Sequence, residues 1–132
     1  MTASTEAISQ QDPVLTLSSQ DMLNTIVTSL DDHKAEDITS INLAGKSSIA
    51  DHLVIASGRS QRQVAALSDY VLRALKDKGV KGLHVEGLDQ ADWVLIDAGD
   101  VIVHIFRPEV RSFYNLDKMW TADLTDNETV VN

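Results

Sequence analysis

Cysteine is absent from this chain of 132 residues. Without thiols the protein forms no disulfide and binds no metal through a thiolate. The absence fits a reducing compartment, and we expect a cytoplasmic protein. Long apolar runs are also missing: no stretch approaches the ~20 apolar residues that a membrane-spanning helix needs, and the N-terminus has no basic segment typical of a signal peptide.

Basic residues are few. Lys and Arg number 11 against 20 Asp and Glu, which gives a net charge of −9. Residues 18–120 hold all 11 basic residues and 15 of the 20 acidic ones, so this part still carries a net charge of −4. Such a body repels a phosphate backbone, which disfavours nucleic-acid binding as the main mode of action. It attracts a basic partner instead, mainly by raising the association rate.

Motifs for nucleotide binding and nucleophilic catalysis are incomplete. The run Ala44-Gly45-Lys46-Ser47-Ser48 resembles the end of a P-loop, but Ser40 stands where that motif requires its first glycine. We therefore interpret residues 44–48 as a polar connecting turn. Ser57-Gly58 resembles half of a nucleophile elbow without the full Gly-x-Ser-x-Gly pattern. We expect no catalytic residues and no cofactor.

Metal ligation is not favoured either. The four histidines, at positions 33, 52, 84 and 104, form no HxH or HxxxH pair. A zinc site would need several of these histidines, or Asp97 and Asp100, to converge across the fold. Asp97, Asp100 and His104 share the predicted hairpin face, but His104 lies near the end opposite the turn. The simpler interpretation is that the two aspartates shape a turn and that His104 packs beside Trp93.

The apolar pattern predicts one domain between two polar ends. Residues 1–17 are expected to be a disordered leader, residues 18–122 the folded domain, and residues 123–132 an acidic, frayed tail. Capping boxes at Ser18 and Ser60 each predict the start of a helix, and Gly79 predicts the end of the second one. Pro108 can open a short final helix. Strands are expected at 37–43, 52–57 and 81–86 and on both sides of a turn within 93–106.

The sequence thus predicts the order α-β-β-α-β-β-β-α. This is an α/β (α+β-like) single domain, with a mixed sheet of about five strands flanked by helices. A helix is ~10 Å wide and strands lie ~4.8 Å apart, so each helix covers about two strands on one face. Two long helices and a short one leave part of the second face open or covered by another molecule.

The most informative stretch is W-V-L-I-D-A-G-D-V-I-V-H-I-F, residues 93–106, which predicts a β-hairpin. A turn of two or four residues places Trp93 opposite His104, Leu95 opposite Ile102 and Asp97 opposite Asp100, whereas a three-residue turn shifts this pairing. One face then carries aliphatic side chains alone, and these are Val94, Ile96, Val101, Val103 and Ile105. The other face mixes large aromatics with polar groups and is a candidate binding surface.

Several runs together resemble the ribosomal silencing factor family, also called RsfS or Iojap. They are A-D-H-L-V-I-A-S-G from Ala50, S-Q-R-Q from Ser60, E-G at residues 86–87, the hairpin itself, and R-S-F-Y-N-L-D-K-M-W from Arg111. The resemblance covers roughly residues 20–120. Its most specific part is W-x-x-x-D-x-G-D-V-x-V-H, followed by R-x-x-Y-x-L-x-x-x-W.

This resemblance implies a small domain similar to the nucleotidyltransferase fold, without the catalytic motif of that superfamily. It further implies binding to a protein of the large ribosomal subunit, the one numbered fourteen. Such binding would sterically block association with the small subunit and repress translation. Carried over by position, the binding residues would be Trp93, Leu95, Tyr114, Leu116 and Met119.

Two alternatives remain open. The chain could be a remnant nucleotidyltransferase that binds nucleotide and magnesium through Asp51 and a second acidic residue. It could also be a homodimer when free, burying the mixed hairpin face against a second copy.

Overall fold

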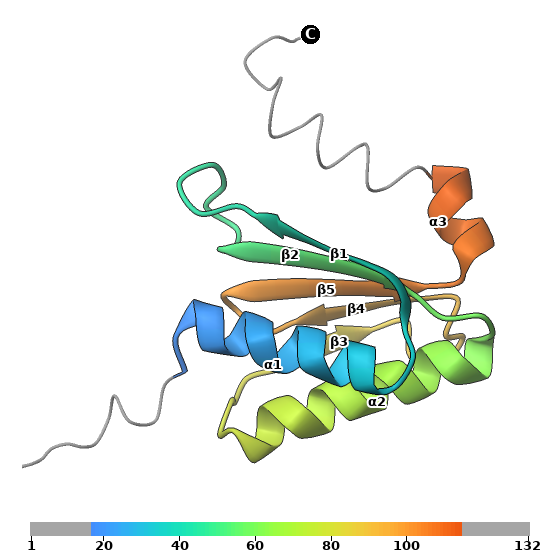
Figure 1. Cartoon of the computed structure of the whole chain (residues 1–132), viewed down its shortest axis with the longest axis horizontal. Coiled ribbons are helices and arrows are strands. Elements are labelled where there is room, and N and C mark those ends of the chain that lie inside the picture. Colours follow the sequence, from blue (N-terminus) through green and yellow to red (C-terminus); the bar gives the residue numbers. More distant parts are fainter. Residues whose placement is uncertain (1–16, 115–132) are drawn as a thin grey trace, which may run out of the picture.

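A computed structural model describes the backbone of residues 17–114 and the side chains of residues 17–111. These residues form three helices and five strands in the predicted order (Figure 1). The elements are α1 (Ser19–Asp32), β1 (Glu36–Asn42), β2 (His52–Ser57), α2 (Gln61–Asp77), β3 (His84–Glu86), β4 (Trp93–Asp97), β5 (Val101–Phe106) and α3 (Pro108–Tyr114). In this part of the chain, no helix has the length and apolar character needed to cross a membrane.

The five strands form one mixed sheet in the order β1-β2-β5-β4-β3. β2 and β5 run parallel at its centre, and the other neighbouring pairs are antiparallel. The predicted α+β domain with a mixed five-stranded sheet is therefore confirmed. β3 is shorter than the predicted 81–86, because Gly82 has a φ of +73° and interrupts the extended backbone before His84.

Local signals set the helix ends as predicted. The Ser18 side chain accepts a hydrogen bond from the Asp21 amide at 3.0 Å, and the Ser60 side chain accepts one from the Gln63 amide at 3.1 Å. The Gln63 side chain does not complete a capping box on Ser60, because its oxygen accepts from the Arg59 amide at 2.7 Å. After α2, Gly79 adopts a φ of +88°, as expected of a residue that ends a helix.

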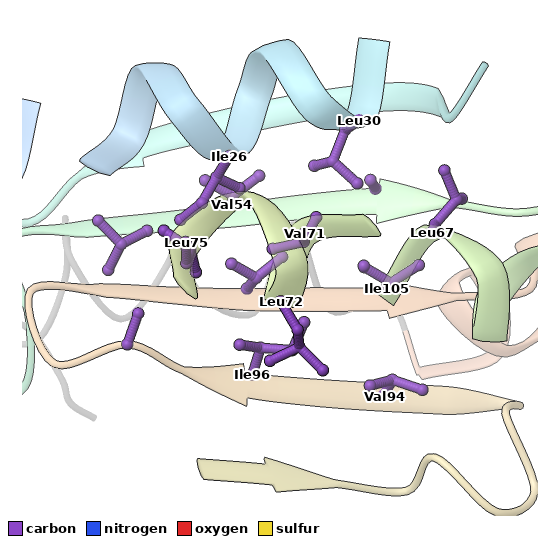
Figure 2. Close-up of a cluster of buried hydrophobic side chains, with 14 of the residues drawn as sticks. Ile26, Leu30, Val54, Leu67, Val71, Leu72, Leu75, Val94, Ile96 and Ile105 are labelled. Atoms are coloured by element: carbon purple, nitrogen blue, oxygen red, sulfur yellow. The ribbon is translucent and has the colours of Figure 1, made fainter. Parts of the chain in front are cut away.

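The main core lies between the sheet and helices α1 and α2, which run side by side along one face (Figure 1). Figure 2 shows the two layers of this core: Ile26 and Leu30 from α1 and Leu67, Val71, Leu72 and Leu75 from α2 meet Val54, Ile105, Ile96 and Val94 from the central strands. All of these side chains are buried. Because α1 and α2 both cover this face, neither of them covers the opposite face.

On the opposite face a smaller core covers only part of the sheet. It contains Leu53 and Ile55 of β2 and Ile102 and Phe106 of β5, together with Leu43 and Ala50 from the β1–β2 connection. Val110 of α3 and Leu95 of β4 pack against its rim. The part of this face that the smaller core leaves accessible lies toward β4 and β3.

The hairpin register differs from the prediction by two residues. Trp93 pairs with Phe106, Leu95 with His104 and Asp97 with Ile102. The predicted pairing places the turn at Ala98-Gly99, whereas the structure has a two-residue turn one position later, at Gly99-Asp100. This turn is closed by a hydrogen bond from the Ala98 amide to the Val101 carbonyl at 3.0 Å. Gly99, with a φ of +88°, occupies a position that favours glycine.

A shift by two residues leaves every side chain on its predicted face. The division of the hairpin into an aliphatic and a mixed face is confirmed: the aliphatic side chains belong to the main core. The mixed face carries Trp93, Leu95, His104 and Phe106.

Candidate functional site: the Trp93 face

The first residue of β4, Trp93, lies at the accessible part of the mixed face. Its side chain is 36 % exposed, whereas its strand neighbours Val94 and Ile96 are fully buried. A hollow of about 280 Å³ opens beside the indole and is lined by Glu86, Gly87, Trp93, Leu95 and His104. A second hollow of about 480 Å³ lies along the 85–93 segment, lined by Val85, Gly87, Leu88, Asp89, Gln90, Asp92 and Trp93. We call these hollows and their lining residues the Trp93 face.

The indole of Trp93 is held by two neighbours on β5. Its Nε1–H donates a hydrogen bond to Nδ1 of His104 at 3.0 Å. The ring of Phe106 lies at a centroid distance of 5.8 Å and an interplanar angle of 62°, an edge-to-face arrangement that aromatic pairs prefer. The expected packing of His104 beside Trp93 is confirmed, with a hydrogen bond that the sequence did not predict.

The His104 imidazole is 8 % exposed. Burial lowers its pKa from 6.5 to about 4, because the protein interior disfavours the charged ring. The ring is thus neutral at physiological pH. Since Nδ1 accepts a hydrogen bond from Trp93, the single ring proton is on Nε2.

The backbone at Trp93 lies against Gly87. A Cβ atom at Gly87 would lie 2.2 Å from the Trp93 carbonyl oxygen, and the φ of Gly87 is +85°. Both features require glycine at this position. Gly87 also accepts a hydrogen bond from the Ala91 amide at 2.9 Å, which closes the loop that leads into β4.

Asp92 joins the start of β4 to the end of β5 and to α2. Its carboxylate accepts hydrogen bonds from Nε of Arg107 at 2.9 Å and from Nε2 of Gln61 at 3.0 Å. The Arg107 amide in turn donates to the Asp92 carbonyl at 3.1 Å. Asp92, the residue before Trp93, is therefore held by Arg107 at the end of β5 and by Gln61 of α2.

Two of the five predicted binding residues, Trp93 and Leu95, lie together on the Trp93 face. Tyr114 is the last described residue of α3, and its side chain lies outside the described part. Leu116 and Met119 also lie outside the described residues.

The contribution of Glu86 at the end of β3 and of the 87–92 loop was not predicted from the sequence. Glu86, Leu88, Asp89 and Asp92 line the two hollows, and Leu88 is 39 % exposed. Apolar residues do not recur at helical or strand spacing within residues 87–92, so the sequence pattern did not predict that this segment forms part of a binding surface. The Glu86-Gly87 pair, six residues before Trp93, was the available signal.

The residues considered for metal binding do not converge. The Asp97 side chain accepts a hydrogen bond from the Gly99 amide at 2.9 Å, which fits the expected role in the turn. His104 lies on Trp93 instead. Among residues 17–111, no group of three or more His, Asp or Glu side chains could hold a metal ion.

The segment that resembles a P-loop is a turn. The amides of Lys46 and Ser47 both donate to the Leu43 carbonyl, at 2.8 and 3.0 Å. Gly45 has a φ of +79°, which suits a tight turn. The interpretation of residues 44–48 as a connecting turn is confirmed.

Comparison with known proteins identifies the class. Residues 16–131 match the family described as "Ribosomal silencing factor during starvation". The ribosomal silencing factor RsfS of Zymomonas mobilis is 57 % identical over 99 residues, covering 75 % of this chain and 74 % of that protein. The chain therefore belongs to the ribosomal silencing factor family.

Two further proteins are similar to this chain, one in structure and one in sequence. A crystal structure of a protein from Chromobacterium violaceum superposes with a TM-score of 0.77 at 35 % identity, covering 80 % of this chain and 88 % of that chain. A mouse protein named "Mitochondrial assembly of ribosomal large subunit protein 1" is 31 % identical over 109 residues, covering 80 % of this chain and 48 % of that protein.

Proposed function

We propose that this protein represses translation by docking its Trp93 face on the large ribosomal subunit, through the basic ribosomal protein numbered fourteen. The bound domain then occupies space that the small subunit needs, and subunit association is blocked. The mechanism is steric. It requires a rigid body at one place and no catalytic step, so we propose a regulatory binding protein of the cytoplasm and not an enzyme.

The exposed indole of Trp93 is the observation that carries this proposal. Tryptophan is enriched among the residues that dominate binding energy at protein interfaces. An indole that is 36 % exposed beside hollows of about 280 and 480 Å³ offers both an anchor and space for partner side chains. The helices α1 and α2 cover the opposite face of the sheet and leave this side accessible (Figure 1).

Charge supports a basic partner. Glu86, Asp89 and Asp92 line the hollows of the Trp93 face, and none of the described Lys and Arg residues lines them. Asp92 is paired with Arg107, so Glu86 and Asp89 carry the charge argument here. The net charge of −9 for the whole chain acts in the same direction. Complementary charge raises the association rate and disfavours acidic partners. Leu95, beside Trp93, supplies apolar contact, and we propose Tyr114, Leu116 and Met119 as further contacts.

The test is co-sedimentation of the protein with purified large subunits. Trp93→Ala should weaken binding by 30-fold or more, about 2 kcal/mol, because a central aromatic contact is lost. Tyr70→Ala is the matched control. Tyr70 is 40 % exposed on α2, within the helical layer that covers the opposite face, and its removal should leave co-sedimentation unchanged. Circular dichroism melts verify that both variants fold. If the Trp93→Ala variant folds and still binds large subunits as tightly as the wild type does, Trp93 is not the anchor.

A further inference from the structure

The Trp93 indole has several possible orientations on an open strand end, yet the structure fixes one of them. Its polar edge is directed toward β5, where Nε1 donates to His104. The ring of His104 is tilted by 42° to the indole at a centroid distance of 5.9 Å. Phe106 contacts both rings, at 5.8 Å from Trp93 and 6.4 Å from His104.

His104 is suited to orient the indole. It lies diagonally across the β4–β5 pair from Trp93, since its direct partner is Leu95. Diagonal neighbours on one face are within reach of long aromatic side chains. The imidazole is buried, so its own orientation is set by the surrounding core before any partner arrives. The buried imidazole of His104 thus accepts a hydrogen bond from the partly exposed indole of Trp93 and holds it in place.

We propose that His104 is a positioning residue for docking, and that its Nδ1 acceptor holds the Trp93 indole in the binding orientation before the ribosomal partner arrives. This inference rests on the proposed function and deepens it. An interface side chain that is already ordered in the free protein loses less conformational entropy on binding. Because the indole N–H is bonded to His104, Trp93 meets the partner with its apolar ring surface.

The test is a double-mutant cycle on affinity for large subunits. His104→Phe keeps a ring of similar size and removes the acceptor, and it should weaken binding about threefold to tenfold. His104→Asn places an oxygen acceptor near the Nδ1 position and should restore binding to within about twofold. In a Trp93→Phe background, which has no indole N–H, His104→Phe should have no further effect.

A spectroscopic readout separates positioning from general stability. In a ¹H–¹⁵N spectrum of the free protein, the Trp93 indole N–H should be shifted and protected from exchange in the wild type and in His104→Asn. It should lose that protection in His104→Phe, while the backbone amides of the core remain unchanged. If His104→Phe does not fold, wild type and His104→Asn remain, and the Trp93 indole N–H must be protected in both; Trp93→Phe identifies that signal by its loss.

Two results would overturn the inference. One is a His104→Phe effect that is equally large in the Trp93→Phe background, which would show that His104 acts independently of the indole. The other is an unprotected Trp93 indole N–H in the wild type. Failure of the proposed function gives a different pattern, because wild type and Trp93→Ala would then sediment alike whatever residue occupies position 104.

Discussion

At the residue scale, His104 ties the stability of the fold to pH. Burial lowers its pKa to about 4, whereas the unfolded chain has the ordinary value of 6.5. Above pH 6.5 the ring is neutral in both states and contributes no pH dependence. Between pH 6.5 and 4 the unfolded chain binds a proton that the folded protein does not. The free energy of unfolding therefore falls as the pH is lowered through this window.

We predict a loss of up to about 3 kcal/mol from His104 across this range, since each pKa unit corresponds to about 1.4 kcal/mol. Urea unfolding of wild type and His104→Asn at intervals from pH 7.5 to 4.5 measures it. The variant lacks this titration, so its stability should fall less steeply. Carboxylates titrate equally in both proteins and cancel in the difference. Parallel curves would contradict a buried, neutral His104.

Gly87 is the second residue on which the Trp93 face depends. Gly87→Ala should destabilise the protein by about 2 kcal/mol, because the new Cβ would clash with the Trp93 carbonyl at a φ of +85°. Gly45→Ala is the matched control: Gly45 has a φ of +79° and nothing within 4 Å of an added Cβ. It should cost about 1 kcal/mol from backbone strain alone. Equal losses in urea unfolding would argue against the close approach at Gly87.

At the element scale, the short helix α3 is joined to the sheet by Arg111. Its guanidinium donates to the Asp37 carbonyl at 2.8 Å, to the Ser57 hydroxyl at 2.9 Å and to the Thr39 hydroxyl at 3.3 Å. It also lies over the Phe106 ring at 5.9 Å. A seven-residue helix is marginal by itself. We infer that these contacts hold α3 beside the end of the sheet.

Arg111→Met should therefore destabilise the protein by about 2 kcal/mol and speed amide exchange in α3. Arg73→Met is the control. Arg73 forms an exposed i,i+4 ion pair with Asp69 at 2.8 Å, and such pairs contribute at most about 0.5 kcal/mol. Denaturant melts and hydrogen exchange measure both quantities. A null effect of Arg111→Met on α3 exchange would show that other contacts hold the helix.

Elements with local signals could be predicted from the sequence. The caps at Ser18 and Ser60 and the stop at Gly79 depend on residues within one turn of each helix, and all three are confirmed. The hairpin register depended on which residues of Asp97-Ala98-Gly99-Asp100 form the turn, and composition alone did not decide that. The contacts of Arg111 could not be predicted because they join segments more than 50 residues apart.

At the scale of the whole molecule, the sequence predicted that the helices leave part of the second face open or covered by another molecule, and that prediction considered helices alone. The structure shows that Leu43 and Ala50 of the β1–β2 connection also cover this face, over β2 and β5. Connections without regular structure leave little apolar pattern, which is why their contribution was missed. The accessible remainder lies at Trp93 and Leu95, where the mixed hairpin face predicted it.

Contact between the Trp93 face and the large subunit can be tested by photo-crosslinking. p-Benzoylphenylalanine is placed at Leu88, which is 39 % exposed and lines a hollow beside the intact Trp93 anchor. The same group in place of Tyr70 serves as the control. With purified large subunits, position 88 should crosslink to the basic ribosomal protein numbered fourteen and position 70 should not. Crosslinking from position 70 alone would place the helical layer at the interface and contradict the account.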